Sequence, residues 1–432
     1  MTTPPTPLPP RLRSGLVLIA QLALLGALIG VACWPLNLVD RWQDLLLHLL
    51  PKFKGGAWSQ VQLLLACSPV LVMPLLLSLQ AGDRWRDGAG SGIPQTMTSI
   101  EDAAAAPALM ATRPVLHRLV IWSIASLSLF PLGREGPVVQ VGAAVAYQLQ
   151  QRWPRLLQRL KTSNVMAVAA GAGLAGGFNT PLMGVIFMAE ELTGRFAPQL
   201  IWPALVVCAV AAEISNLGGQ PLFSLGQVQA QLIEASQLVW GAVMGVICGM
   251  AGGLFAWLLL GATRWLTPRV RQQPWRWGLV LGALLTGLAL LSGGASGGDG
   301  EALMSWLLSN PEAHHGSLIM LVARLLGPVL ALGAGIPGGL IDPAFAIGAV
   351  LGDLLGRFSQ QSLFGVTFGM TAALAGATQL PAMSLVFALR MAGDQQLLPG
   401  VAMAAVIGSY MGRLWMHKPV YHALTDLMHE RD

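Results

Sequence analysis

Apolar segments of unequal length, separated by short polar stretches, follow one another along almost the whole chain. The first two cover residues 15–34 and 61–79, and each is long enough to cross a bilayer as one helix. Later segments cover residues 200–216, 238–260, 277–291, 318–332, 343–355, 364–377, 381–391 and 399–414, and all of these except 238–260 are shorter than the first two. The pattern predicts an all-α integral membrane protein in which many helices are broken or tilted.

Composition supports this interpretation. The chain is 54% hydrophobic and only 10% charged, and its mean hydropathy is +0.62. Its 51 glycines and 28 prolines are too many for simple spanning helices, and inside apolar runs they indicate breaks that line a cavity or pack against neighbouring helices. Residues 14–432 are expected to form a single transmembrane domain, preceded by a disordered cytoplasmic tail over residues 1–13.

Charge and cysteine usage narrow the possibilities further. Arg84 and Arg86 follow the second apolar segment, which places residues 82–95 in the cytoplasm by the positive-inside rule. Polar stretches around Asp40 and over residues 292–316 are expected to be an amphipathic connection and an extracellular loop. The sequence has no long basic tract of the kind that binds nucleic acid. It also has no Cys/His cluster of the kind that binds a metal or another cofactor.

One carboxylate interrupts the apolar pattern where a helix starts. Gly133-Arg134-Glu135-Gly136-Pro137 breaks one helix and opens another, because proline is tolerated at a first helical position. A helix that begins inside a membrane presents free N–H groups and a partial positive charge, which form an anion site. Glu135 is expected to occupy that site when ionised and to leave it when protonated or displaced. The alternative is a helix-capping acid at the membrane surface, although intramembrane acids are usually functional.

Two further stretches carry candidate anion ligands. Gly90-Ser91-Gly92-Ile93-Pro94 has the form of a loop that feeds a helix N-terminus, where a hydroxyl and backbone N–H groups can form a nest, but the same pattern is also an ordinary turn. Tyr421 lies near the start of a short C-terminal helix predicted over residues 418–430. Its phenol can donate to an anion, or the residue can lie at the membrane interface.

A pair of acids closes the apolar segment over residues 164–192. Glu190 and Glu191 stand at its end, near the predicted cytoplasmic side. They are either solvated charges at a helix end or an entry point for protons.

The second half of the chain repeats the first. Leu174-Ala175-Gly176 recurs as Leu374-Ala375-Gly376, a displacement of 374 − 174 = 200 positions. Gly133 corresponds to Gly339 at a displacement of 339 − 133 = 206, which places Ile341 opposite Glu135. We therefore predict two inverted repeats, about residues 61–217 and 238–414, with a transport site between them near the membrane midplane.

Together these stretches resemble the CLC family of chloride channels and proton-coupled chloride transporters. Residues 90–94 are similar to the family's GSGIP signature, residues 133–137 to GREGP, residues 338–343 to GGxFxP, and residues 418–421 to the segment that bears its central tyrosine. The resemblance covers nearly the whole chain after the tail, and four ordered motifs are far more specific than one.

The resemblance implies roles for individual residues. Ser91 and Tyr421 would contact the central chloride, Glu135 would be the external gating glutamate, and Glu191 the internal proton-transfer glutamate. The other implied anion-binding residues lie at helix starts: Gly92, Ile93, Gly136, Ile341 and Asp342. The resemblance also implies a homodimer with one pore per subunit, placed in a bacterial inner membrane.

Two residues depart from the family pattern. Ile341 stands where phenylalanine is usual, which keeps an apolar wall but alters the gate or the selectivity. Asp342 follows directly, and an acid beside an anion path should repel the anion unless it is neutralised or turned away.

The sequence thus predicts a chloride/proton antiporter in which Glu135 and chloride compete for one site, with no cofactor. A passive channel of the same fold and a transporter of another small anion are the nearest alternatives. An enzyme that uses Glu135 as a general base would need a second polar group or a metal-ligand set at membrane depth, which the sequence lacks.

Overall fold

The computed structural model describes residues 10–49, 55, 57–158, 160–217, 236–309, 315–358, 362–393 and 395–430. Within these ranges the ordered elements are helices, and the single β-type contact is an isolated bridge. The predicted all-α class is confirmed. Five helical stretches are long and apolar enough to cross a membrane: Ser14–Leu47, Gln60–Ala81, Pro198–Ser215, Ser236–Gln272 and Pro274–Leu291.

The first half of the chain contains nine α-helices in its described part. They are α1 (Pro10–Leu49), α2 (Gln60–Ala81), α3 (Ile93–Glu101), α4 (Ala106–Leu109), α5 (Thr112–Leu127), α6 (Glu135–Arg152), α7 (Thr162–Phe178), α8 (Pro181–Phe187) and α9 (Pro198–Ser215). A 3₁₀ turn over Arg86–Gly88 and a π-helical turn over Met188–Leu192 complete this half.

The second half has a matching series among its described residues. Its helices are α10 (Ser236–Gln272), α11 (Pro274–Leu291), α12 (Glu301–Ser309), α13 (Leu318–Gly333), α14 (Ile341–Gly356), α15 (Ser362–Thr378), α16 (Pro381–Ala392), α17 (Leu398–Gly412) and α18 (Val420–His429), with a 3₁₀ turn over Gln395–Leu397. Helix α12 occupies part of residues 292–316, so the predicted extracellular loop contains a helical segment. The short apolar run from Ala302 to Leu308 packs into the core and orders this segment as a helix.

Equivalent helices end in the same way in the two halves, which confirms the internal repeat. Helices α7 and α15 both have 17 residues, and each is followed by a left-handed residue, Asn179 with φ 48° and Gln379 with φ 62°. Helices α6 and α14 begin after Arg134 and Leu340, whose φ/ψ angles are −109°/−3° and −110°/−6°.

The contacts also assign α1 to the first repeat, upstream of its predicted start at residue 61. Helix α1 packs against α7 and α9 as α10 packs against α15 and α17, and the two have 40 and 37 residues. The stretch around Asp40 is therefore the last part of a continuous helix rather than a connection. Residues 10–13 of the predicted tail are helical, since proline is favourable in a first turn, while residues 1–9 lie outside the described residues.

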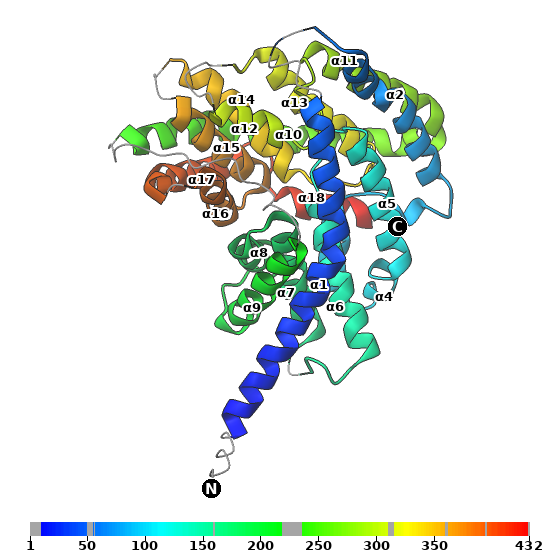
Figure 1. Cartoon of the computed structure of the whole chain (residues 1–432), viewed down its shortest axis with the longest axis vertical. Helices are drawn as coiled ribbons and strands as arrows, with labels where there is room; N and C mark the ends of the chain where they lie inside the picture. The colour runs from blue at the N-terminus through cyan, green and yellow to red at the C-terminus, as the bar shows by residue number, and fades with distance from the viewer. Residues whose placement is uncertain are drawn as a thin grey trace.

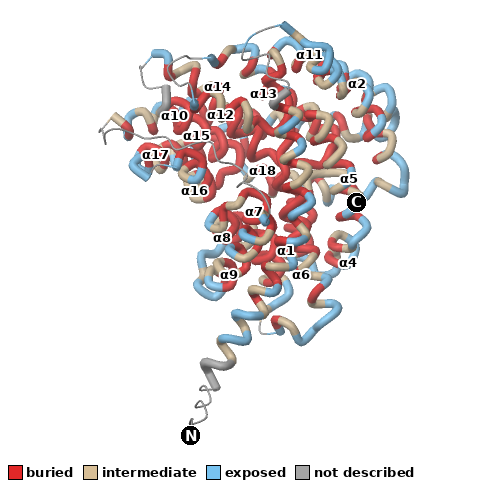
Figure 2. The backbone as a smooth tube through the Cα atoms, in the orientation of Figure 1, coloured by how far each residue is buried: buried red, intermediate tan, exposed pale blue. Residues whose placement is uncertain are grey.

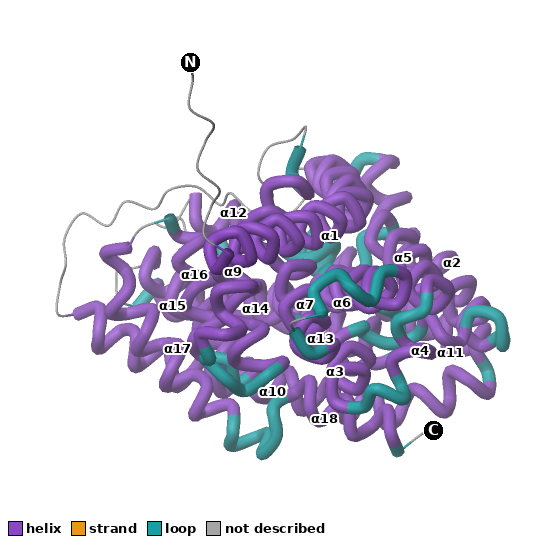
Figure 3. Tube along the Cα trace, turned by 90° about the horizontal axis from the view of Figure 1, so that it is seen from below, coloured by secondary structure: helices purple, strands orange, loops and turns teal. Residues whose placement is uncertain are grey.

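Figure 1 shows how these helices surround the centre of the molecule. The long α1 runs from the protruding N-terminal end across the middle, with α14 to α17 on one side and α2, α5 and α11 on the other. Helix α18 lies near the middle of this view. The view turned by 90° shows α18 beside α10 and α3 (Figure 3). Buried residues concentrate around this centre, and exposed ones lie on the outer helices such as α2, α9 and α11 (Figure 2).

Glycines allow the central helices to approach closely. A Cβ atom at Gly348 or Gly352 of α14 would overlap the carbonyl oxygen of Gly369 or Gly365 of α15. Small residues four positions apart are typical of helix contacts in membranes, where close backbone packing replaces the hydrophobic effect. This packing fixes α14, and with it the helix start that faces Glu135.

Candidate functional site

The starts of α6 and α14 meet in the middle of the molecule. Gly133 donates its N–H to the Gly339 carbonyl at 3.0 Å, and Gly339 donates to the Gly133 carbonyl at 2.9 Å. These two glycines are the pair matched by the internal repeat, and each stands two residues before its helix. The bridge therefore joins the repeats at equivalent points and brings two positive helix ends together.

The Glu135 carboxylate lies on the start of the opposite helix. Its Oε1 accepts the backbone N–H of Asp342 at 2.8 Å, and the residue is fully buried. A carboxylate from the first repeat thus occupies the N-terminal end of α14 in the second, where both the N–H group and the helix dipole favour an anion. A Cβ atom at Gly133 or Gly339 would overlap this carboxylate, which is why these positions need glycine.

The start of α3 lies beside the start of α6. The backbone and side-chain oxygens of Ser91 lie so close to Gly136 that a Cβ atom there would collide with them. The Ser91 hydroxyl is buried and has no hydrogen-bond partner among the described residues. A buried hydroxyl normally has a partner, so this donor is suited to a ligand.

Gly92 has a local partner at the start of α3. It adopts φ 110°, and its N–H donates to the Gln95 Oε1 at 2.9 Å. A side chain of the same helix thus already accepts this N–H, which was expected to face the anion. The Ile93 residue that follows is fully buried and begins the helix.

Tyr421 begins the last helix inside the protein. It is fully buried, its ring packs edge-on against Phe187 with centroids 6.4 Å apart, and its hydroxyl has no hydrogen-bond partner among the described residues. The phenol lies in the electrostatic field of Glu135, Glu191 and Asp342. Tyr421 therefore does not lie at the membrane interface. The charges of Glu135 and Glu191 both act on its hydroxyl.

The two acids after α8 have different partners. Glu190 accepts the backbone N–H groups of Ala382 and Met383 at 3.0 and 2.8 Å, so it caps the start of α16. Glu191 is buried, and its Oε1 lies 3.2 Å from Nδ1 of His422 on α18. Neither is a free solvated charge, and the sequence alone did not single out His422.

Arg134 has a buried counter-charge that sequence reasoning missed. Its guanidinium pairs with the Asp40 carboxylate of α1 and lies 4.7 Å from the centroid of the Phe178 ring. Both charged side chains are almost fully buried. This ion pair holds Arg134, the residue before Glu135, against α1.

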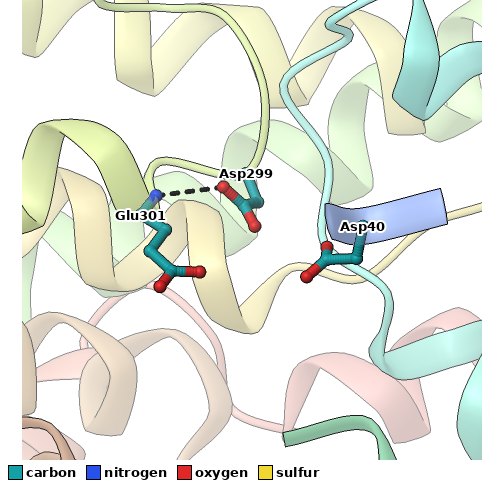
Figure 4. Close-up of side chains that lie close together, drawn as sticks. All are labelled: Asp40, Asp299 and Glu301. Carbon is teal, nitrogen blue, oxygen red and sulfur yellow. Dashed lines mark hydrogen bonds between the residues drawn. The ribbon is translucent and has the colours of Figure 1, made fainter. Parts of the chain in front are cut away.

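Further acids surround Asp40. Asp40, Asp299 and Glu301 each offer an oxygen within 4.8 Å of the others, and Figure 4 shows the three carboxyl groups directed toward a common space. Asp299 accepts the Glu301 backbone N–H at 3.0 Å, while Asp40 is already paired with Arg134. The three oxygens are of the type that hard cations prefer, but the carboxyl groups already have interactions within the protein.

Asp342 connects this acidic cluster to the Glu135 site. Its carboxyl group is fully buried, and neither oxygen has a hydrogen-bond partner among the described residues. The charges that act on it are those of Glu135, Asp299, Arg134 and Glu301. Its backbone N–H donates to the Glu135 carboxylate. Its side chain, when ionised, adds a negative charge to the site, so the carboxyl group must be either protonated or balanced by a positive charge.

Comparison with known proteins gives concordant matches. The family described as voltage gated chloride channel matches residues 70–413 of this chain. The voltage-gated ClC-type chloride channel ClcB of Salmonella typhimurium is 31% identical over 305 residues, which cover 67% of this chain and 70% of that protein. A ClcB of Escherichia coli is 31% identical over 310 residues, covering 68% and 71% of the two chains.

Solved structures of the same fold include two antiporters. A slow cyanobacterial Cl⁻/H⁺ antiporter superposes with a TM-score of 0.75 at 21% identity, over 95% of this chain and 98% of that one. A CLC-type fluoride/proton antiporter has a TM-score of 0.72 at 23% identity, over 93% and 95% of the two chains. At these identities the likeness establishes the fold, a multi-pass arrangement of membrane helices.

Proposed function

This chain belongs to the voltage gated chloride channel family, and from that premise we propose that it exchanges chloride for protons across a bacterial inner membrane. The observation that carries the proposal is the fully buried Glu135 carboxylate on the Asp342 N–H at the start of α14. A group that occupies an anion site and also binds protons can couple the two ions.

Coupling follows from competition for one place. Two unit charges about 4 Å apart repel by roughly 4 kcal/mol at an effective dielectric constant of about 20. Chloride and ionised Glu135 therefore exclude each other at the start of α14. Chloride enters when Glu135 takes up a proton and leaves, and the proton departs when Glu135 returns.

The proposed anion site combines helix starts and two hydroxyls. The Ser91 and Tyr421 hydroxyls donate to chloride, since both are buried without protein partners in the described part of the chain. The residues that supply helix starts are Ile93 on α3, Gly136 on α6, and Ile341 and Asp342 on α14. Fully buried Ile341 forms an apolar wall where the family usually has phenylalanine.

The proposed proton branch reaches the site from the cytoplasmic side through Glu191. This residue is buried, and its charge acts on Tyr421, as does that of Glu135. A proton released by Glu135 passes toward Glu191 while the anion moves the other way. By analogy with the family, the working unit is a homodimer with one pore per subunit.

The decisive experiment measures proton movement driven by a chloride gradient in liposomes that contain the purified protein, with the voltage clamped by potassium and valinomycin. Uphill proton movement is expected. Glu135→Ala should keep chloride flux and lose proton movement, because the variant lacks the competing carboxylate, whereas continued proton pumping by that variant would exclude the mechanism.

Other outcomes separate the remaining functions. Chloride flux without proton movement in the unmodified protein would identify a passive channel of the same fold. Flux of fluoride but not chloride would identify a transporter of another small anion. Absence of flux for either anion would refute the proposal.

A further inference from the structure

His422 connects the buried Glu191 carboxyl group to the protein surface. Its side chain is 43% exposed, while that of Glu191 is 1% exposed, and Nδ1 of the imidazole lies 3.2 Å from Oε1 of the carboxylate. The residue directly follows Tyr421 at the start of α18. One ring thus touches solvent and a carboxyl group that solvent scarcely reaches.

The surface around His422 is aqueous in character. Lys418 and Asp426 form an exposed ion pair at 2.7 Å on the same segment, and the exposed His429 lies 3.1 Å from the Thr98 hydroxyl of α3. Helix α3 begins at Ile93, at the end of residues 82–95, which the positive-inside rule places in the cytoplasm. The imidazole therefore faces the side from which the proposed function draws its internal protons.

Charges from several elements act on the imidazole. The close approach of the Glu191 carboxylate raises the pKa of His422 above its ordinary value, and the negative charges of Glu191, Glu101 and Asp426 raise it further, against the opposing effect of partial burial. Glu191 belongs to the π-helical turn, Glu101 to α3 and Asp426 to α18 itself. The ring accordingly keeps its second proton to a higher pH than an ordinary imidazole does, and that proton lies next to the Glu191 carboxylate.

We propose that His422 is the cytoplasmic proton-exchange group of this protein and that it relays protons between solution and Glu191. In the inward step the N–H bond at Nδ1 breaks and an O–H bond forms at Oε1 of Glu191. The imidazole is left neutral with its remaining proton on Nε2. Because Nδ1 is itself buried against Glu191, the ring resets by turning about its Cβ–Cγ bond, so that water protonates the bare nitrogen at the exposed side before the ring returns. The reverse sequence releases a proton to the cytoplasm. This inference rests on the proposed antiport.

A merely structural role makes a different prediction. If the imidazolium only neutralises Glu191, any permanent positive charge at position 422 would serve. If it exchanges protons, a group that stays charged near neutral pH would fail. His422→Lys keeps the charge and loses the exchange, and His422→Gln loses both.

The test measures chloride-driven proton transport and chloride flux in liposomes, with the same pH on both sides. At neutral pH His422→Gln should reduce proton transport by about tenfold or more, since positioned acid–base groups contribute at least that much, while chloride flux changes by less than about twofold. Proton transport by the unmodified protein should fall as pH rises through the raised pKa of His422. This decrease should be absent from the pH profile of His422→Gln.

Two controls make the result specific. His422→Lys should remain as slow as His422→Gln, and added imidazole should restore part of the proton transport to His422→Gln. His429→Gln, on the same helix, removes an imidazole that contacts the Thr98 hydroxyl instead of Glu191, and this variant should behave as the unmodified protein.

Proton transport unchanged in His422→Gln, or restored by His422→Lys, would overturn the relay while leaving antiport intact. Absence of proton movement in the unmodified protein would overturn antiport and relay together.

Discussion

Gly339→Ala is expected to expel the Glu135 carboxylate from the start of α14. A Cβ atom at this position would overlap Oε2 of Glu135, and would lie 2.9 Å from the Glu135 backbone nitrogen. Gly339 does not have a positive φ, so alanine fits the local backbone. The Glu135 carboxyl group has the largest overlap and must leave its place, and the backbone at Glu135 must also shift slightly.

The magnitude follows from the interaction that the carboxylate gives up. Its bond to the Asp342 N–H, 2.8 Å long, is charge-assisted, and such bonds contribute about 1.5–3 kcal/mol. Chloride no longer competes against this bond in the variant. Its affinity should therefore rise by roughly tenfold to a hundredfold, because about 1.4 kcal/mol corresponds to each factor of ten.

Calorimetric titration of the purified protein with chloride measures this change, and liposome flux measures its consequence. The variant should bind chloride more tightly, conduct it, and lose most of its proton coupling. Gly287→Ala is the matched control, since a Cβ atom there meets nothing within 4 Å. An unchanged chloride affinity with intact coupling would refute the placement of the carboxylate, and complete loss of chloride binding would mean that the new methyl group fills the anion position itself.

Three other substitutions test neighbouring parts of the site. Asp40→Asn should lower the free energy of unfolding by about 3–5 kcal/mol, because it leaves the buried Arg134 without its paired carboxylate, and thermal unfolding in detergent measures this. Asp342→Asn keeps the backbone donor and removes a buried carboxyl group without hydrogen-bond partners in the described structure, so it should raise both thermal stability and chloride affinity. Glu190→Gln should lower thermal stability through the loss of charge on the α16 cap and preserve proton coupling, whereas Glu191→Gln should reduce proton transport and keep chloride flux.

Each of these expectations has a control or an opposing result. Lys418→Ala breaks an exposed ion pair and should change stability by only about 0–1 kcal/mol, in contrast to Asp40→Asn. Weaker chloride binding in Asp342→Asn would mean that the Asp342 carboxyl group assists the anion rather than opposing it. Equal loss of proton coupling in Glu190→Gln and Glu191→Gln would contradict the separate roles assigned to these adjacent acids.

The site was partly predictable because some of its parts are local. Gly133 and Gly339 were matched by spacing alone, and the structure joins them through two hydrogen bonds. The buried position of Tyr421 was left open, since a tyrosine near the start of a terminal helix is common at membrane interfaces. The local partner of Gly92 was not predicted, because nothing in the motif reveals that Gln95 turns back to accept its N–H.

The missed residues have partners far away in the chain. Asp40 looked like part of an amphipathic connection, and only the packing of α1 against α6 brings it to Arg134. His422 carries no signal in the sequence, because its partner Glu191 belongs to the first repeat and lies 422 − 191 = 231 positions earlier in the chain. Such pairs depend on helix crossings, which a single sequence does not specify.

The sequence by itself determined the helical class, the interrupted helices and the repeat, because hydrophobic segment length and the placement of glycine and proline act locally. It also determined that a carboxylate stands at a helix start. Tertiary structure decided that this carboxylate also reaches a second helix start: Glu135 accepts the N–H of Asp342, 207 positions away. Close glycine contacts between helices set that distance, and electrostatic attraction to the N-terminus of α14 holds the carboxylate there.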